Sequence, residues 1–144
     1  MKKIVSMVFL ALFITLLSFP AYAAQRPRNN SPDSHVHVNY VNIASLNAGL
    51  SLNSSGKATC TGSVTLYSKS NTAQLSVQLQ KYSSGSWSTL YTWSATARGT
   101  SPTNIVKSYN VARGQYRVST TAKVYNASGT LLETQTARSA TRTY

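Results

Sequence analysis

Apolar and polar residues alternate through most of the chain after residue 35, and this alternation limits the possible folds more than any other feature. Residues 75–80, for example, read Leu-Ser-Val-Gln-Leu-Gln, and the same period of two recurs at 46–52, 57–68 and 115–125. Successive side chains of a β-strand point to opposite faces, so this period predicts strands with one buried and one wet face. No segment after residue 35 shows a sustained 3.6-residue apolar period. The sequence therefore predicts an all-β domain.

The stretch 73–95 is predicted to form a hairpin at the centre of this domain. Ser83 to Ser86 supply a turn in which Gly85 can take a positive φ. Trp87, Tyr91 and Trp93 follow on the second strand. Because large aromatic side chains dominate core energetics, we expect these three to share one face and the core to condense on them.

Turn signals recur about every 8 to 12 residues from His35 onward, which indicates about eight strands in one antiparallel two-sheet β-sandwich over residues 35–144. Gly114 precedes Gln115 and Tyr116 at the start of a predicted strand. This order is typical of the tyrosine corner, in which the hydroxyl bonds back to upstream backbone, and it favours an immunoglobulin-like sandwich.

The N-terminal region predicts export. Lys2 and Lys3 precede an apolar run from residue 4 to residue 19, and Ala21-Tyr22-Ala23 follows Pro20. These three parts are those of a secretory signal peptide, residues 1–23, cleaved after Ala23. The run is short for a transmembrane anchor, and nothing later is apolar enough to be one. Residues 24–34 are rich in Pro, Asn, Ser and Arg, which predicts a flexible arm. We therefore expect a secreted protein, extracellular or associated with the cell surface.

The balance of charge predicts anionic partners. The chain carries 14 Lys and Arg against two acids, and removal of Lys2 and Lys3 leaves a net charge of +10. A cationic surface rich in hydroxyls and amides attracts polyanions outside the cell, such as teichoic acid, acidic polysaccharide or lipid headgroups, although it also simply confers solubility. The absence of zinc-knuckle and helix-turn-helix patterns makes nucleic acid a weaker candidate. The sequence leaves the oligomeric state open.

Three motifs resemble a known group of proteins. They are the hairpin LQKYSSGSWSTLYTWSA with its SGSW…W pattern, the GxYR motif at 114–117, and the VYNxSGxxxE motif ending at Glu133. Together, over roughly residues 43–133, they are similar to small secreted proteins of Gram-positive bacteria that have no assigned activity. The resemblance implies secretion and an all-β domain, and it transfers no catalytic residue.

Catalysis finds little support in the residue types present. A carboxylate pair would have to combine Asp33, in the arm, with Glu133, which we expect to be an exposed strand residue near Lys or Arg. A serine triad lacks its nucleophile elbow. Cys60, the only cysteine, is four residues before Val64 and therefore points to the same face of the predicted strand. We expect it to face inward as a small hydrophobic residue. The chain is thus not expected to be an enzyme or to need a cofactor.

One group of residues could nevertheless bind a metal ion. Asp33, His35 and His37 would point to the same side of an extended strand, where two imidazoles and a carboxylate could hold Zn²⁺ or Cu²⁺. The alternative is a pair of solvent-facing histidines on an edge strand, since the chain offers no evident fourth ligand.

Binding surfaces are the better-supported prediction. Aromatic rings beside cations can stack on sugars and pair with anionic groups. The candidate binding residues are Tyr67, Tyr82, Tyr125, Lys57, Lys81, Lys107, Arg117 and Lys123. The predicted function is a secreted, non-enzymatic, cationic β-sandwich that binds anionic or glycan polymers of the bacterial envelope. The alternatives are a bacteriocin-like protein acting on neighbouring cells, and a metal-dependent enzyme using His35 and His37.

Overall fold

The computed structural model describes residues 39–144 of the 144-residue chain. The predicted signal peptide (1–23), the predicted arm (24–34) and the metal candidates Asp33, His35 and His37 lie outside the described residues. Residues 39–144 contain eight strands and no helix, as the alternation predicts. Residues 39 and 40, which follow the stretch of Asp33, His35 and His37 that was expected to be extended, are not in a strand.

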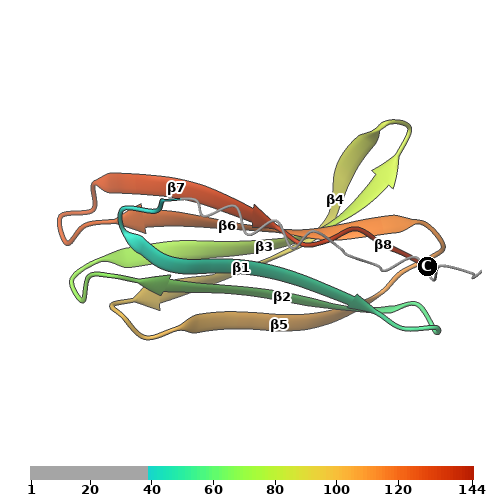
Figure 1. Ribbon diagram of the computed structural model, residues 1–144, viewed down its shortest axis with the longest axis horizontal. Helices are drawn as coiled ribbons and strands as arrows, with labels where there is room; N and C mark the ends of the chain where they lie inside the picture. The colour runs from blue at the N-terminus through green and yellow to red at the C-terminus, as the bar shows by residue number, and fades with distance from the viewer. Residues whose placement is uncertain (1–38) are drawn as a thin grey trace, which may run out of the picture. The chain divides into compact units, whose positions relative to one another are not determined.

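The strands form two antiparallel sheets that pack face to face (Figure 1). They are β1 (Ile43–Leu52), β2 (Lys57–Leu66), β3 (Thr72–Ser83), β4 (Ser86–Arg98), β5 (Thr103–Asn110), β6 (Gln115–Tyr125), β7 (Leu131–Arg138) and β8 (Arg142–Thr143). One sheet has the order β1-β2-β5. The other has the order β4-β3-β6-β7, with the short β8 pairing to β6 beyond the end of β7. Across the sandwich β2 faces β3, β1 faces β6 and β7, and β5 faces β4.

The core lies between the sheets and is mainly aliphatic. The alternate residues of β2, β3 and β6 are buried, as their period of two predicts. The side chains that are less than 2% exposed include Tyr116, Ile43, Leu66, Leu75, Leu79, Val64, Val77, Val118 and Val124. Cys60 is buried among them, on the predicted face. Burial of this apolar surface is the main stabilising contribution to the fold.

The expectation that the core condenses on Trp87, Tyr91 and Trp93 is wrong. Tyr91 is 48% exposed, and both tryptophans are only partly buried. A β-bulge shifts the register between β3 and β4, so that Leu79 pairs with Tyr91 whereas Gln80 pairs with Thr89. The extra residue on β4 reverses the side-chain parity beyond it. Trp87 therefore lies on the outer face of the sheet, while Tyr91 and Trp93 stay on the inner side.

The predicted tyrosine corner is present at the start of β6. The Tyr116 hydroxyl donates a hydrogen bond of 2.7 Å to the carbonyl oxygen of Ala112, four residues upstream. Tyr116 is only 1% exposed, so this bond satisfies a buried hydroxyl and fixes the connection from β5 to β6.

Glu133 is not the exposed partner of Lys or Arg that the sequence suggested. It is half-buried on β7, and its carboxylate accepts hydrogen bonds from the backbone N–H groups of Asn42 at 2.7 Å and Val41 at 3.4 Å. Because residues 41 and 42 lead directly into β1, the carboxylate joins the two sheets at one side of the sandwich.

Thr120 should be a stabilising position for substitution. Its side chain is fully buried in the core, and its hydroxyl has no hydrogen-bond partner among residues 39–144. An unsatisfied buried hydroxyl costs about 1–3 kcal/mol, so Thr120→Val, which keeps the shape, should raise the free energy of unfolding by about 1 kcal/mol. Urea denaturation measures this, with Thr121→Val as the control, because the Thr121 hydroxyl lies 2.8 Å from that of Thr136. A loss of stability in Thr120→Val would contradict the assignment of an unpartnered hydroxyl.

Candidate ligand-binding face

The outer face of the β4-β3-β6-β7 sheet carries a groove with a polar lining. Residues of β3 and β6 whose side chains alternate with the buried ones face outward here, because the register pairs Gln74 with Lys123 and Gln80 with Arg117. The groove has a volume of about 490 Å³ and is lined by Gln74, Leu75, Ser76, Gln78, Ser94, Ala95, Thr96, Thr121 and Lys123. Six of these nine lining residues end in an amide or a hydroxyl. The surface therefore offers both hydrogen-bond donors and acceptors.

The tip of the β3–β4 hairpin bends out of the sheet and projects away from its other strands near one end of this face (Figure 1). The bulge explains the bend, because a bulged strand kinks and gains twist. The ring of Trp87 on β4 lies over the guanidinium of Arg117 on β6, with 4.1 Å from the ring centroid to Cζ. Tyr82 adds a second ring, 5.2 Å from that of Trp87. The stacking of Trp87 on Arg117 thus joins β4 to β6, which do not pair in the sheet.

Arg117 is held in one orientation. Its Nε donates a hydrogen bond of 2.8 Å to Oε1 of Gln80, and Trp87 covers one face of the guanidinium. A planar guanidinium that is stacked and bonded at Nε still presents its terminal N–H groups to a ligand. The arrangement is therefore a pre-oriented donor of hydrogen bonds to an anion.

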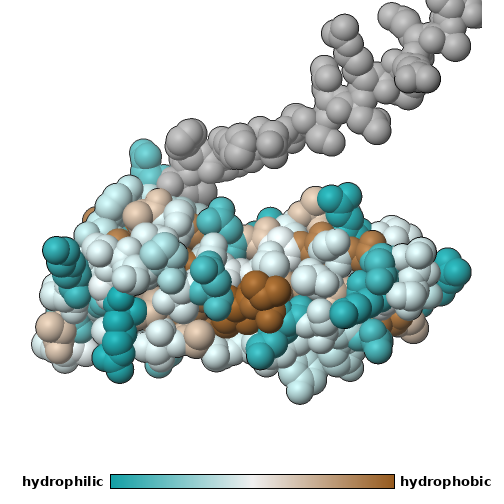
Figure 2. Space-filling view, turned by 90° about the horizontal axis from the view of Figure 1, so that it is seen from below, coloured by the Kyte–Doolittle hydropathy of each residue, from teal (hydrophilic) through white to brown (hydrophobic). Residues whose placement is uncertain are grey.

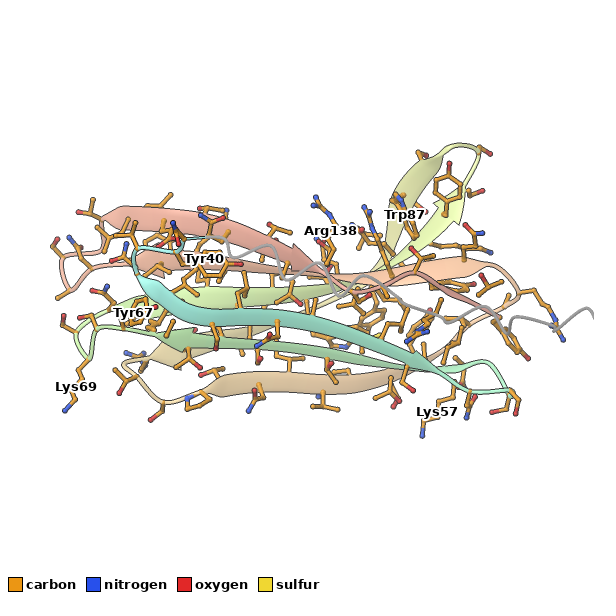
Figure 3. All side chains as sticks on the ribbon, in the orientation of Figure 1. Tyr40, Lys57, Tyr67, Lys69, Trp87 and Arg138 are labelled. Carbon is orange, nitrogen blue, oxygen red and sulfur yellow. The ribbon has the colours of Figure 1, made fainter. Side chains whose placement is uncertain are left out.

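Arg138 adds a second positive charge at the same end. It pairs with Ser119 across β6 and β7, next to Arg117 along the outer face. Desolvation, followed by repulsion from Arg138, lowers the pKa of Arg117. Figure 3 shows Arg138 and Trp87 at the same end of the sheet. Ser119 beneath them is only 6% exposed, so the floor of the face is covered here.

No acidic side chain in residues 39–144 compensates these two arginines. Glu133 is the only carboxylate side chain in that part of the chain, and its oxygens accept hydrogen bonds from Val41, Asn42 and Gln135. An uncompensated pair of like charges favours an anion from outside the domain.

Four of the eight predicted binding residues lie on this face. They are Tyr82, Arg117, Lys123 and Tyr125. The others are dispersed: Tyr67 is 64% exposed in the loop after β2, Lys57 faces outward on the opposite sheet, and Lys107 is on β5 opposite Cys60. Lys81 points to the end of the sandwich, with Nζ 5.8 Å from the Tyr116 ring.

Sequence reasoning missed Trp87, Arg138 and the glutamines of the face. The alternation along β3 does predict that Gln78 and Gln80 point outward. The bulge that moves Trp87 to the same face, however, cannot be recognised from the alternating sequence pattern. The alternation along β7 would have predicted that Arg138 points to this face, but only if the pairing of β7 with β6 had been known.

A second surface lies on the open side of the sandwich, between edge strands β4 and β5. Tyr91 contacts Trp93 and Tyr109, with ring centroids 5.0 and 5.4 Å apart. Figure 2 views the molecule from the side of β5 and shows a largely hydrophilic surface with a compact hydrophobic patch near its middle and smaller hydrophobic areas elsewhere. Val106 on β5 is 63% exposed. The aromatic rings cover the core where β4 and β5 do not pair, so their role in sealing the core accounts for their position.

Residues 39–144 add no candidate metal ligands to those considered from the sequence. Within residues 39–144 no three His, Cys, Asp or Glu side chains lie close enough together to hold a metal ion. The same residues include no helix that is long and apolar enough to cross a membrane. Burial raises the pKa of the Cys60 thiol to about 11, which keeps it protonated and unreactive at neutral pH.

The Cys60 thiol predicts how stability changes at high pH. The unfolded thiol ionises near pH 9, whereas the folded thiol stays neutral until about pH 11. The unfolded state thus binds fewer protons between these values, and the free energy of unfolding should fall by on the order of 2 kcal/mol from pH 9 to pH 11. Tyrosines also titrate there, so the measurement is the stability difference between the native protein and Cys60→Ala. This difference should shrink as the pH rises, and a constant difference would refute the burial of the thiol.

Comparison of the sequence with protein-family models gives no match, and comparison with curated proteins gives none either. The residues of the face therefore carry the functional reasoning by themselves.

Proposed function

We propose that this chain is a secreted, non-enzymatic binding protein of the bacterial envelope, and that the outer face of the β4-β3-β6-β7 sheet binds its anionic or glycan polymers. The observation that carries the proposal is the presence, on one face of the sheet, of a groove of amides and hydroxyls and, farther along the same strands, of Trp87, Arg117 and Arg138. Export rests on the N-terminal sequence pattern, and the resemblance to small secreted Gram-positive proteins agrees with it.

We further assign the fold to the immunoglobulin-like sandwiches. Two observations support the assignment: strands 1, 2 and 5 form one sheet and strands 3, 6 and 7 the other, and the tyrosine corner occurs at the start of strand 6. The fourth strand joins strand 3, whereas in constant-type antibody domains it lies in the sheet of strands 1, 2 and 5. Because such sandwiches serve many functions, the fold alone does not decide the ligand.

The chemistry of the face favours polyhydroxylated polymers. Each sugar hydroxyl both donates and accepts a hydrogen bond, as do the Ser and Thr hydroxyls and the Gln amides that line the groove. Tyr82 and Trp87 offer aromatic surface at the hairpin end of the same face, and the arginines attract anionic substituents.

Retention on purified bacterial cell walls tests this function. The protein should sediment with the walls at low salt and be released partly at high salt, because salt screens the charged contacts. Trp87→Ala should reduce retention at least about tenfold, whereas Tyr67→Ala, which removes an exposed aromatic ring far from the face, should leave it unchanged. Equal retention of the two variants, or no retention of the native protein at low salt, contradicts the proposal. Dye leakage from bacterial cells in the absence of wall binding would favour the antibacterial alternative instead.

A further inference from the structure

We infer that the ligand of the outer face is a sparsely charged acidic polysaccharide, with neutral sugars along the groove and an oxyanion group held between Arg117 and Arg138. The inference rests on the proposed function and narrows it from polyanions and glycans in general to one class of polymer. The evidence is the distribution of charge on the face, which has cations near its two ends and neutral side chains in its middle.

The cations of the face gather at its two ends. Arg117 and Arg138 lie at the end near the hairpin tip, and Lys123 and Arg98 lie at the other end, opposite Gln74 and Thr72 of β3. Arg117 and Lys123 are six residues apart on β6, which corresponds to about 20 Å along the strand. Lys123 is the only cation among the residues that line the groove, and a ligand that spans the whole face meets positive charge only near the two ends of the face.

The middle of the face is neutral. Its side chains across the four strands are Ser94, Thr92, Ser76, Gln78, Ser119, Thr121 and Thr136. Amides and hydroxyls replace the water around sugar hydroxyls well, but they do not neutralise a buried charge. A polymer with an anionic group on every unit would place charges over this neutral middle and lose their hydration without a counter-charge. A polymer with its charges separated by several neutral sugars avoids this cost.

The end near the hairpin tip has the properties of an oxyanion subsite. Trp87 and Gln80 fix the guanidinium of Arg117, so its terminal N–H groups can form two parallel hydrogen bonds to a carboxylate or a phosphate. Arg138 brings a second charge to the neighbouring strand, because it pairs with Ser119, two residues from Arg117 along β6, and it has no carboxylate side chain as partner in residues 39–144. Carboxylate and phosphate share this chemistry, so the experiment includes both.

An array of bacterial polysaccharides tests the inference. Its glycans are of three kinds: neutral polymers, polymers with one carboxylate or one phosphate per repeat of several sugars, and polymers with a charge on every sugar. The protein should bind the sparsely charged kind most strongly. Arg117→Gln with Arg138→Gln should reduce that binding at least about tenfold and leave the weaker binding to neutral glycans in place. A preference for carboxylate or for phosphate identifies the source of the oxyanion.

The control variant, Lys57→Gln with Lys107→Gln, removes the same charge from other surfaces and should bind as the native protein does. Equal binding to neutral and sparsely charged glycans overturns the inference and leaves the proposed function standing. Strongest binding to the densely charged kind, or an equal loss in the control variant, also overturns it. Binding to none of the glycans or to the cell walls overturns the proposed function itself.

Discussion

Gly62→Ala should destabilise the protein by about 3 kcal/mol, the largest effect we expect from the addition of one carbon atom. Gly62 is on β2 and faces the opposite sheet, where a Cβ would overlap Cγ2 of Val77 and lie 2.7 Å from Oγ1 and 3.1 Å from Cγ2 of Thr120. Val77 and Thr120 are fully buried and paired across β3 and β6, so neither can move away without disturbing the core. Such overpacking costs about 1–3 kcal/mol or more. Urea denaturation measures the loss.

Two further variants separate steric overlap from other causes. Val77→Ala removes one overlapping atom, so the double variant with Gly62→Ala should lose less stability than the sum of the two single losses. Gly49→Ala is the matched control: its Cβ would meet only the Thr61 hydroxyl, which belongs to a half-buried side chain that can rotate. It should cost less than about 1 kcal/mol. Additive losses for Gly62 and Val77 would contradict the close approach of the sheets at Gly62.

Glu133→Ala should lower the free energy of unfolding by about 2 kcal/mol. The substitution removes the acceptor of the Asn42 N–H at 2.7 Å and of the Val41 N–H at 3.4 Å, and hydrogen bonds to charged groups contribute about 1.5–3 kcal/mol each. Asn42 also accepts a hydrogen bond from the Tyr67 N–H through its carbonyl oxygen. Loss of the carboxylate should therefore loosen the start of β1 and the loop that follows β2, which amide hydrogen exchange reports residue by residue.

Glu133→Gln provides the control for this prediction. Its amide oxygen can still accept one of the two hydrogen bonds, but without the charge, so it should lose less than the alanine variant. If both variants were as stable as the native protein, Glu133 would be a surface residue, as its sequence suggested, and not a link between the sheets.

Most of the fold was predicted from the alternation of apolar and polar residues, because this pattern depends only on neighbouring side chains pointing to opposite faces of a strand. It assigned β2, β3 and β6 to strands and put Cys60, Val77 and Val118 inside. The bulge in β4 broke this reasoning: one extra residue reverses parity, and Trp87 and Tyr91 consequently lie on opposite faces. The core is formed mainly by aliphatic residues and not by these three aromatic residues.

The candidate binding face was only partly predictable for a related reason. Parity shows that Arg117 and Lys123 point outward, but it does not show which sheet β6 joins or which strands lie beside it. Register places Gln80 next to Arg117 and Arg138 next to Ser119, and register depends on contacts between residues far apart in the sequence. Glu133 was misjudged in the same way, because its partner Asn42 is 91 residues away.

The central claim, that the outer face of the β4-β3-β6-β7 sheet binds an acidic glycan, is tested most directly by an NMR titration of the ¹⁵N-labelled protein. The titrant is the polysaccharide fragment that the glycan array identifies. Our account predicts that the amide signals of Gln78, Ser119 and Thr121 and the indole signal of Trp87 shift together in a saturable way, while those of Thr59 and Ser63 on the opposite sheet stay in place. Shifts confined to the β1-β2-β5 sheet, or spread over every exposed Lys and Arg without saturation, would contradict it.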